Sequence, residues 1–309
     1  NRVFTDPSLA GQLSNQPFYA PFAMLLQVMY RLIGFTYGQI WVPISAFCLG
    51  WFTWGLMRQR VHPFLADLLL LLYVLTPEML GYSYLVQTDH INAAYVAIGA
   101  MLVWYAAFAG QRALLWASVL LFAAGCWART ETPLLIGIGA VACMPLLARA
   151  FTWRTAITWV GVLGVSVIAV FALWHVLFFN AYLPVQPSTS DQLVGMDVGR
   201  FIDVVGSSFT NVIADPHLWA GTFIVFAIVM VANLVVERSA EPAILLIWIG
   251  AVLLGLWIVG TIFSAAIVEQ TLRRGIFKII PLLFVAMSAT KLLERFSDRL
   301  RQWEAGRTS

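Results

Sequence analysis

Charged residues are scarce in this chain. Asp, Glu, Lys and Arg make up only 11% of its 309 residues, whereas hydrophobic residues make up 61%. Soluble domains carry about 25% charged residues, so the polar residues here are too few to cover a water-facing surface. The composition predicts an integral membrane protein, leaves no room for a separate soluble catalytic domain, and gives no indication of nucleic-acid binding.

Cysteine is also rare, and it forms no pattern typical of a metal centre or a disulfide framework. Cys48, Cys126 and Cys143 lie in apolar runs without CxxC or Cys/His spacing, so we predict that they are buried in lipid or pack between helices. A Gly-rich phosphate loop is missing too. The chain opens at Asn1 with a polar stretch, not with the basic segment and apolar run of a signal peptide, and we expect that something upstream has been removed.

Long apolar runs dominate the remainder of the sequence. Roughly twenty apolar residues cross a bilayer as a helix, and such runs predict an all-α, polytopic transmembrane protein of about nine spanning helices. They lie at about 39–57, 64–86, 91–109, 113–128, 132–148, 155–179, 218–236, 243–267 and 275–290.

The same pattern predicts how the chain is divided. Residues 1–38 are expected to end an external loop, with an amphipathic helix at 18–36 that lies on the membrane surface because Arg31 interrupts it. Residues 39–309 form the transmembrane domain. Within it, the polar segment 180–217 is the predicted external loop, in which VGRFIDVVGSSFTNVI could form a short amphipathic helix.

Basic residues indicate the orientation, because cytoplasmic loops hold an excess of Lys and Arg. If residues 1–38 lie outside, eleven of the eighteen Lys and Arg fall on the inner side. Without the C-terminal tail the count is six against seven, so the prediction depends on that tail. The expected location is the inner membrane of a bacterium, with the active site outside.

Ionisable residues gather at the predicted outer face. A charge at the centre of a spanning helix costs at least ~2.5 kcal/mol, so such residues usually face the protein interior or a cavity. The stretch TPEMLGYSYLVQTDHINAA holds Glu78, Asp89 and His90. Asp89 could cap the helix that starts near Ile91, coordinate a divalent metal such as Mg²⁺ or Mn²⁺, or position an acceptor hydroxyl.

A second outer connection, CWARTETPLLIG, places Arg129 and Glu131 between two apolar runs. The two could simply pair at the surface. Alternatively, Arg129 offers its planar donor fork to a phosphate, while Glu131 holds that arginine or a sugar hydroxyl.

A third connection, VEQTLRRGIFKIIPLLF, puts Arg273, Arg274 and Lys278 on the outer side. An anionic lipid headgroup would account for them, and interfacial anchoring is the alternative. His217, just before the seventh predicted span, is a further candidate for substrate binding.

Taken in order, these segments resemble the C-superfamily of membrane glycosyltransferases, the GT-C fold, which includes dolichyl-phosphate-mannose and aminoarabinose transferases. QPFYAPFAMLLQVMYRLIGF resembles the stretch that closes the first external loop of that family. VLTPEMLGYSYLVQTDHINAAYVAIGAMLVWY is similar to its third and fourth helices, CWARTETPLLI to a conserved turn, and RRGIFKIIPLLFVAMSATKLL to its closing segment.

The resemblance implies transfer of a sugar from a polyprenyl-phosphate donor to a lipid, glycan or protein acceptor. It implies that Asp89 and Glu131 are catalytic, with Asp89 near a metal or the acceptor, and that Arg129, Arg273 or Arg274 bind substrate beside His90 and His217. The first helix of the family and its acidic pair have no counterpart here, since Asp6 is the only acid before Asp67. We therefore expect this chain alone to be inactive.

Two other classes fit parts of the pattern. A transporter or lipid-linked sugar flippase also uses polar residues at helix ends, although we find no pair of matching broken helices. A polysaccharide polymerase or ligase would use the same lipid carrier.

Overall fold

The protein is described by a computed structural model over residues 28–36, 40–83, 88–173, 177, 194–237, 239–263 and 268–306. These residues form helices and no β-strand, which confirms the predicted all-α class. The helices are α3 (Trp41–Arg60), α4 (Pro63–Val74), α5 (Pro77–Tyr82), α6 (Thr88–Ala109), α7 (Arg112–Ala128), α8 (Thr132–Ala150), α9 (Trp153–Ala172), α11 (Val198–Ser207), η3 (Ser208–Ile213), α12 (Pro216–Trp219), α13 (Thr222–Ala232), η4 (Asn233–Glu237), α14 (Ala243–Ile262), η5 (Val268–Leu272), α15 (Arg273–Ile276), α16 (Ile280–Ser288) and α17 (Lys291–Ala305).

Four of the described helices are long and apolar enough to cross a membrane. They are α6, α8, α9 and α14, and the bent pair Gln270–Ser288 and Lys291–Ala305 would make a fifth if it counts as one span. The described residues thus confirm a chain with membrane-spanning helices but not nine spans. The apolar helices Pro63–Val74, Arg112–Ala128 and Thr222–Glu237 are shorter than this criterion requires.

The predicted span at 64–86 is wrong as a single helix. The chain leaves the helical conformation at Thr76, whose ψ is 114°, and α5 starts at Pro77. Proline has no N–H to donate and disfavours the helical conformation in the residue before it. The break places Glu78 in the first turn of a separate short helix.

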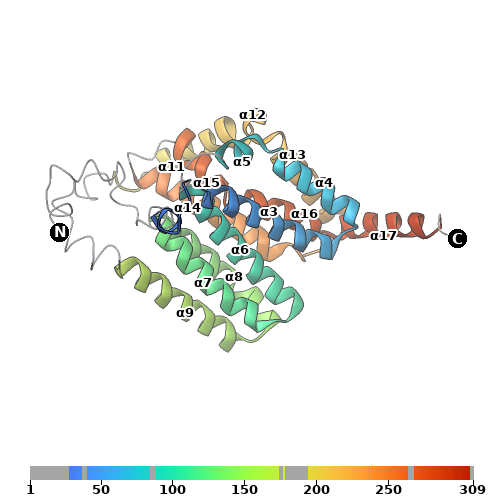
Figure 1. The fold of residues 1–309 in the computed structure, drawn as a ribbon, viewed down its shortest axis with the longest axis horizontal. Coiled ribbons are helices and arrows are strands. Elements are labelled where there is room, and N and C mark those ends of the chain that lie inside the picture. The colour runs from blue at the N-terminus through green and yellow to red at the C-terminus, as the bar shows by residue number, and fades with distance from the viewer. Residues whose placement is uncertain are drawn as a thin grey trace.

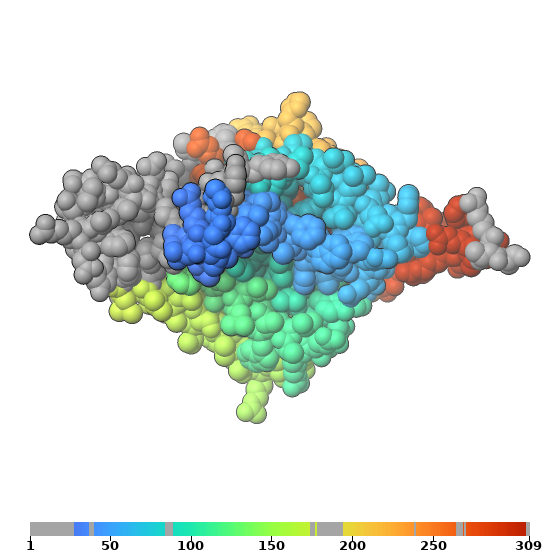
Figure 2. Space-filling view, viewed as in Figure 1, coloured from blue at the N-terminus to red at the C-terminus, as the bar shows by residue number. Residues whose placement is uncertain are grey.

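The long helices run between two ends of a bundle (Figure 1). We call one the Asp89 end, where α6 and α8 begin and α7 ends. We call the other the Arg60 end, where α3 ends beside the segment before α14. Two contacts join these segments: Arg60 pairs with Glu241, and Trp104 donates to the Glu241 carbonyl at 3.1 Å. Figure 2 shows α3 and α4 next to each other on one face.

Close packing of α8 against α14 holds the core together. A Cβ at Gly139 of α8 would lie 2.4 Å from the Trp248 ring of α14, and one at Gly255 of α14 would lie 2.2 Å from Leu135 of α8. Each helix therefore offers a glycine to a large side chain of the other. Of the three cysteines, Cys126 and Cys143 are buried, Cys48 is exposed, and all three are free.

The predicted external loop contains the short helix that its sequence indicated. α11 is capped by Asp197, which accepts from the Gly199 and Arg200 amides at 3.4 and 3.1 Å. Val204 is buried, whereas Val198 and Ile202 are exposed. Residues 180–193 of this loop lie outside the described residues, as do most of the interfacial helix predicted at 18–36 and its boundary at residue 38.

Candidate functional site

Arg129 is the centre of a buried ionic cluster at the Asp89 end. Its guanidinium donates to the Asp89 carboxylate from one nitrogen, and its Nε lies 2.6 Å from Glu131 Oε1. The side chains of Arg129 and Asp89 are 4% and 2% exposed. One arginine thus joins the first turn of α6 to the start of α8, with both carboxylates removed from water.

The local sequence explains this geometry. α7 ends at Ala128, Arg129 is extended with ψ 141°, and Glu131 is the residue before α8. Asn92 of α6 holds the turn in place, since its Nδ2 donates to the Gly125 carbonyl at 2.8 Å and to Thr132 Oγ1 at 2.9 Å. The turn that carries the ionic pair is therefore fastened to α6, the helix that carries Asp89.

Two more cations approach the same carboxylates at longer distances. Lys278 lies between α15 and α16, is fully buried, and has its Nζ 3.6 Å from Glu131 Oε1. Arg274 of α15 has an Nη1 3.8 Å from Asp89 Oδ2. Neither distance is that of a hydrogen bond, so these two cations are held less firmly than Arg129.

The charges around Glu131 control its ionisation. Burial by itself would raise the pKa of the Glu131 carboxyl, but the neighbouring Arg129 and Lys278 outweigh burial and lower that pKa. Glu131 is therefore ionised at neutral pH and is a weak base.

A further ion pair borders the cluster. Arg273 Nε donates to Glu78 Oε2 at 2.7 Å, and its Nη2 donates to the other oxygen of the same carboxylate. This is the bidentate geometry typical of arginine and a carboxylate. Together with the cluster, the Asp89 end has four cations (Arg129, Arg273, Arg274, Lys278) against three carboxylates (Glu78, Asp89, Glu131).

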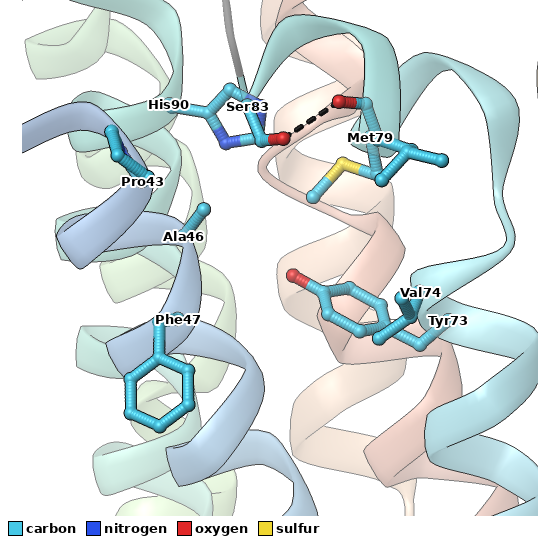
Figure 3. Close-up of a pocket in the computed structure, with 9 residues that line it drawn as sticks. Pro43, Ala46, Phe47, Tyr73, Val74, Met79, Ser83 and His90 are labelled. Carbon is cyan, nitrogen blue, oxygen red and sulfur yellow. Dashed lines mark hydrogen bonds between the residues drawn. The ribbon is translucent and has the colours of Figure 1, made fainter.

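His90 adjoins this cluster and lines a crevice. Its ring is 2% exposed and stacks on Phe277 at 5.4 Å. Neither ring nitrogen has a hydrogen-bond partner among the described residues. The crevice has a volume of about 210 Å³ and runs between α3 on one side and α4 and α5 on the other (Figure 3). It is lined by Pro43, Ala46, Phe47, Tyr73, Val74, Met79, Leu80, Ser83 and His90.

The residues around Asp89 do not fit a divalent cation. Within the described residues, no group of three or more His, Cys, Asp and Glu side chains could hold a metal ion. The oxygens of Asp89 face Arg129 and Arg274, and those of Glu131 face Arg129 and Lys278. In the described residues these carboxylates are thus turned towards protein cations, which would repel a further cation, and the expected metal stays a prediction.

The structure brings most of the predicted site residues together. Asp89, Glu131, Arg129 and Arg274 form the cluster, and His90 and Arg273 border it. Asp89 does not cap a helix that starts near Ile91, because α6 already includes Thr88.

His217 stands apart from this group. It is exposed in α12, where its backbone N–H donates to Asp215 at 2.8 Å.

Sequence reasoning missed three features of the site. It did not pair Glu78 with Arg273, since 195 residues separate them. It assigned no role to Asn92, although an amide inside an apolar helix is a signal of buried hydrogen bonding. It treated Lys278 only as a residue for a headgroup or an anchor, whereas the structure buries it beside Glu131.

Comparison of the chain with protein-family models, curated proteins and solved structures gives no match.

Proposed function

We propose that this protein transfers a sugar from a polyprenyl-phosphate donor to an acceptor, with the Asp89 end as the site of transfer. The observation that carries the proposal is the cluster itself: two buried carboxylates surrounded by Arg129, Arg274 and Lys278. Isolated buried charges are costly, and a cluster with an excess of cations suits an anionic group such as a lipid phosphate.

The distances divide the cations into two groups. Arg129 is bound to both carboxylates and serves to hold them in place. Arg274 Nε donates to the Gln270 carbonyl at 3.1 Å, but Arg274 and Lys278 approach the carboxylates only at 3.8 and 3.6 Å. They can therefore turn towards a phosphate without breaking a hydrogen bond to Asp89 or Glu131. They are our choice for stabilising the negative charge that develops on the leaving phosphate.

Asp89 is the proposed proton acceptor. When Arg274 turns towards the phosphate, Asp89 Oδ2 becomes available to a hydroxyl of the acceptor. The proton passes to that carboxylate, the hydroxyl oxygen forms a bond to the anomeric carbon, and the bond from that carbon to the phosphate oxygen breaks. The polyprenyl phosphate leaves with the electron pair, and Glu131 keeps Arg129 in position.

The crevice supports a lipid-linked donor. Most of its lining is apolar, and His90 lies at the end nearest the cluster. A hydrocarbon chain in the crevice would end beside His90, the residue that follows Asp89.

In this proposal the shorter apolar helices also cross the membrane. The Asp89 end faces outward from a bacterial inner membrane. That orientation follows the distribution of Lys and Arg.

Sugar transfer in membranes that contain the natural protein tests the proposal. Arg274→Gln should lower the rate about 100-fold, because one donor to the developing charge is lost, and Asp89→Asn should abolish transfer. Arg301→Gln, at an exposed pair with Asp298, is the matched control and should keep the full rate. Full transfer by Arg274→Gln and Asp89→Asn would reject the site. Uptake of lipid-linked sugar into vesicles without transfer would indicate a flippase.

A further inference from the structure

The C-terminal helix α17 has two different apolar sides. On one side Leu293 and Leu300 pack against the core, and Ser297 between them is fully buried. On the other side Phe296 is 49% exposed. Leu292, Phe296 and Arg299 follow one another at spacings of four and three residues, so they share one face of the helix.

The docked side is fixed by ion pairs at the Arg60 end. Arg295 Nη1 lies 2.7 Å from Glu237 Oε1, and Glu304 Oε2 lies 3.0 Å from His62 Nε2. These contacts set which way the helix is turned and leave Phe296 half exposed beside the docked side. Figure 2 shows α17 extending beyond the α3 and α4 end of the molecule.

On α17 itself one basic side chain, Arg299, accompanies the exposed apolar side, and other cations are exposed elsewhere at the Arg60 end. Lys291 and Arg299 are exposed, and so are four arginines at other helix ends of the Arg60 end: Arg58, Arg112, Arg149 and Arg154. Ion pairs among the described residues engage the carboxylates Glu237, Glu241, Asp298 and Glu304 but none of these six cations. The exposed surface of the Arg60 end, from which α17 projects, therefore has an excess of positive charge.

The direction of α17 also matters. It leaves the preceding segment at an angle of 56°, and Thr290 caps it by accepting from the Leu293 amide at 3.4 Å. α16, just before it, is buried over its whole length. A helix that turns away from a buried segment at the end of a membrane bundle can run along the membrane surface.

We propose that the Phe296 side of α17 binds the surface of a bilayer that contains anionic lipids. Amphipathic helices with basic residues beside an aromatic and aliphatic face lie in the interface in this way, and each Lys or Arg is attracted by anionic headgroups. This surface is distinct from the Asp89 end, and the proposal does not depend on sugar transfer.

Fluorescence quenching by lipids tests this proposal with the whole protein in nanodiscs. In a Cys48→Ser background, in which the two remaining cysteines are buried, a fluorophore is attached at Phe296→Cys or, as the matched control, at Asp298→Cys on the opposite side of the same helix. Nitroxide on the lipid chains should quench position 296 strongly and position 298 weakly in discs with phosphatidylglycerol. Arg299→Gln, on the Phe296 side, should lower the ratio of bound to unbound helix about fivefold.

Three results would overturn the proposal. Equally weak quenching at positions 296 and 298 would place the helix in water. Equal quenching of position 296 in neutral and anionic discs would remove the role of charge. Shielding of position 296 in detergent that increases with protein concentration would identify a second copy as the partner.

Trypsin cleavage tests the same proposal without a fluorophore, which could itself change how the helix binds. Trypsin should cut after Arg299 more slowly in anionic than in neutral discs, and equal rates would contradict the proposal.

Discussion

At the Arg60 end Glu237, Glu241 and Glu304 each pair with a single side chain, whereas at the Asp89 end several charges share a buried cluster. In two of the Arg60-end pairs one partner is largely in solvent. Glu304 and Arg295 are 58% and 69% exposed. By contrast, Glu131 is 10% exposed and Lys278 is fully buried. The two ends of the bundle thus use the same residue types in different environments, exposed at one end and buried at the other.

The difference indicates where function lies. Exposed ion pairs contribute about 0–1 kcal/mol, which is enough to fasten helix ends without much cost. Buried charges lose their hydration, and replacing them by apolar residues is often neutral or stabilising. Stability alone therefore does not explain the Asp89 cluster, and the lipid phosphate that we propose as its ligand would account for the cations.

The largest expected effect is that of Arg129→Ala. The variant leaves the Asp89 and Glu131 carboxylates buried without their shared partner, and breaking a buried pair in this way costs about 3–5 kcal/mol. Thermal unfolding in detergent measures the loss. Glu304→Gln, which removes one exposed carboxylate from the Arg60 end, is the control and should cost no more than about 1 kcal/mol. Equal losses in the two variants would abolish the contrast between the ends.

Lys278→Met compares the contributions of Lys278 and Arg129 to the stability of the cluster. Glu131 keeps Arg129 at 2.6 Å when Lys278 is replaced, and methionine fills the buried volume without a charge. We expect no loss of stability relative to the natural chain, together with loss of sugar transfer. Unfolding temperature and transfer rate are measured on one preparation. A loss of stability as large as that of Arg129→Ala would make Lys278 a structural cation and remove it from the proposed phosphate site.

The sequence predicted the composition of the site better than the course of the helices. Asp89, Arg129 and Arg274 could be anticipated because charges beside apolar runs must be shielded. The pair of Glu78 with Arg273 could not, since it depends on the break at Pro77 and on packing between distant segments. The described residues contain four or five helices long enough to span, not the nine predicted, because a run of apolar residues does not reveal where a helix such as α4 stops.

Acid should weaken the cluster through Glu131. Its folded pKa lies below that of an unfolded glutamate, about 4.3, because Arg129 and Lys278 favour the ionised form despite burial. Such a group contributes stability that is complete above the unfolded pKa and is lost as the pH falls through the folded pKa. Unfolding measured from pH 7 to pH 3 should therefore show a steeper decline for the natural chain than for Glu131→Gln. Parallel curves for the two proteins would mean that the Glu131 carboxylate gains nothing from its cations, and the cluster would then resemble the exposed pairs of the Arg60 end.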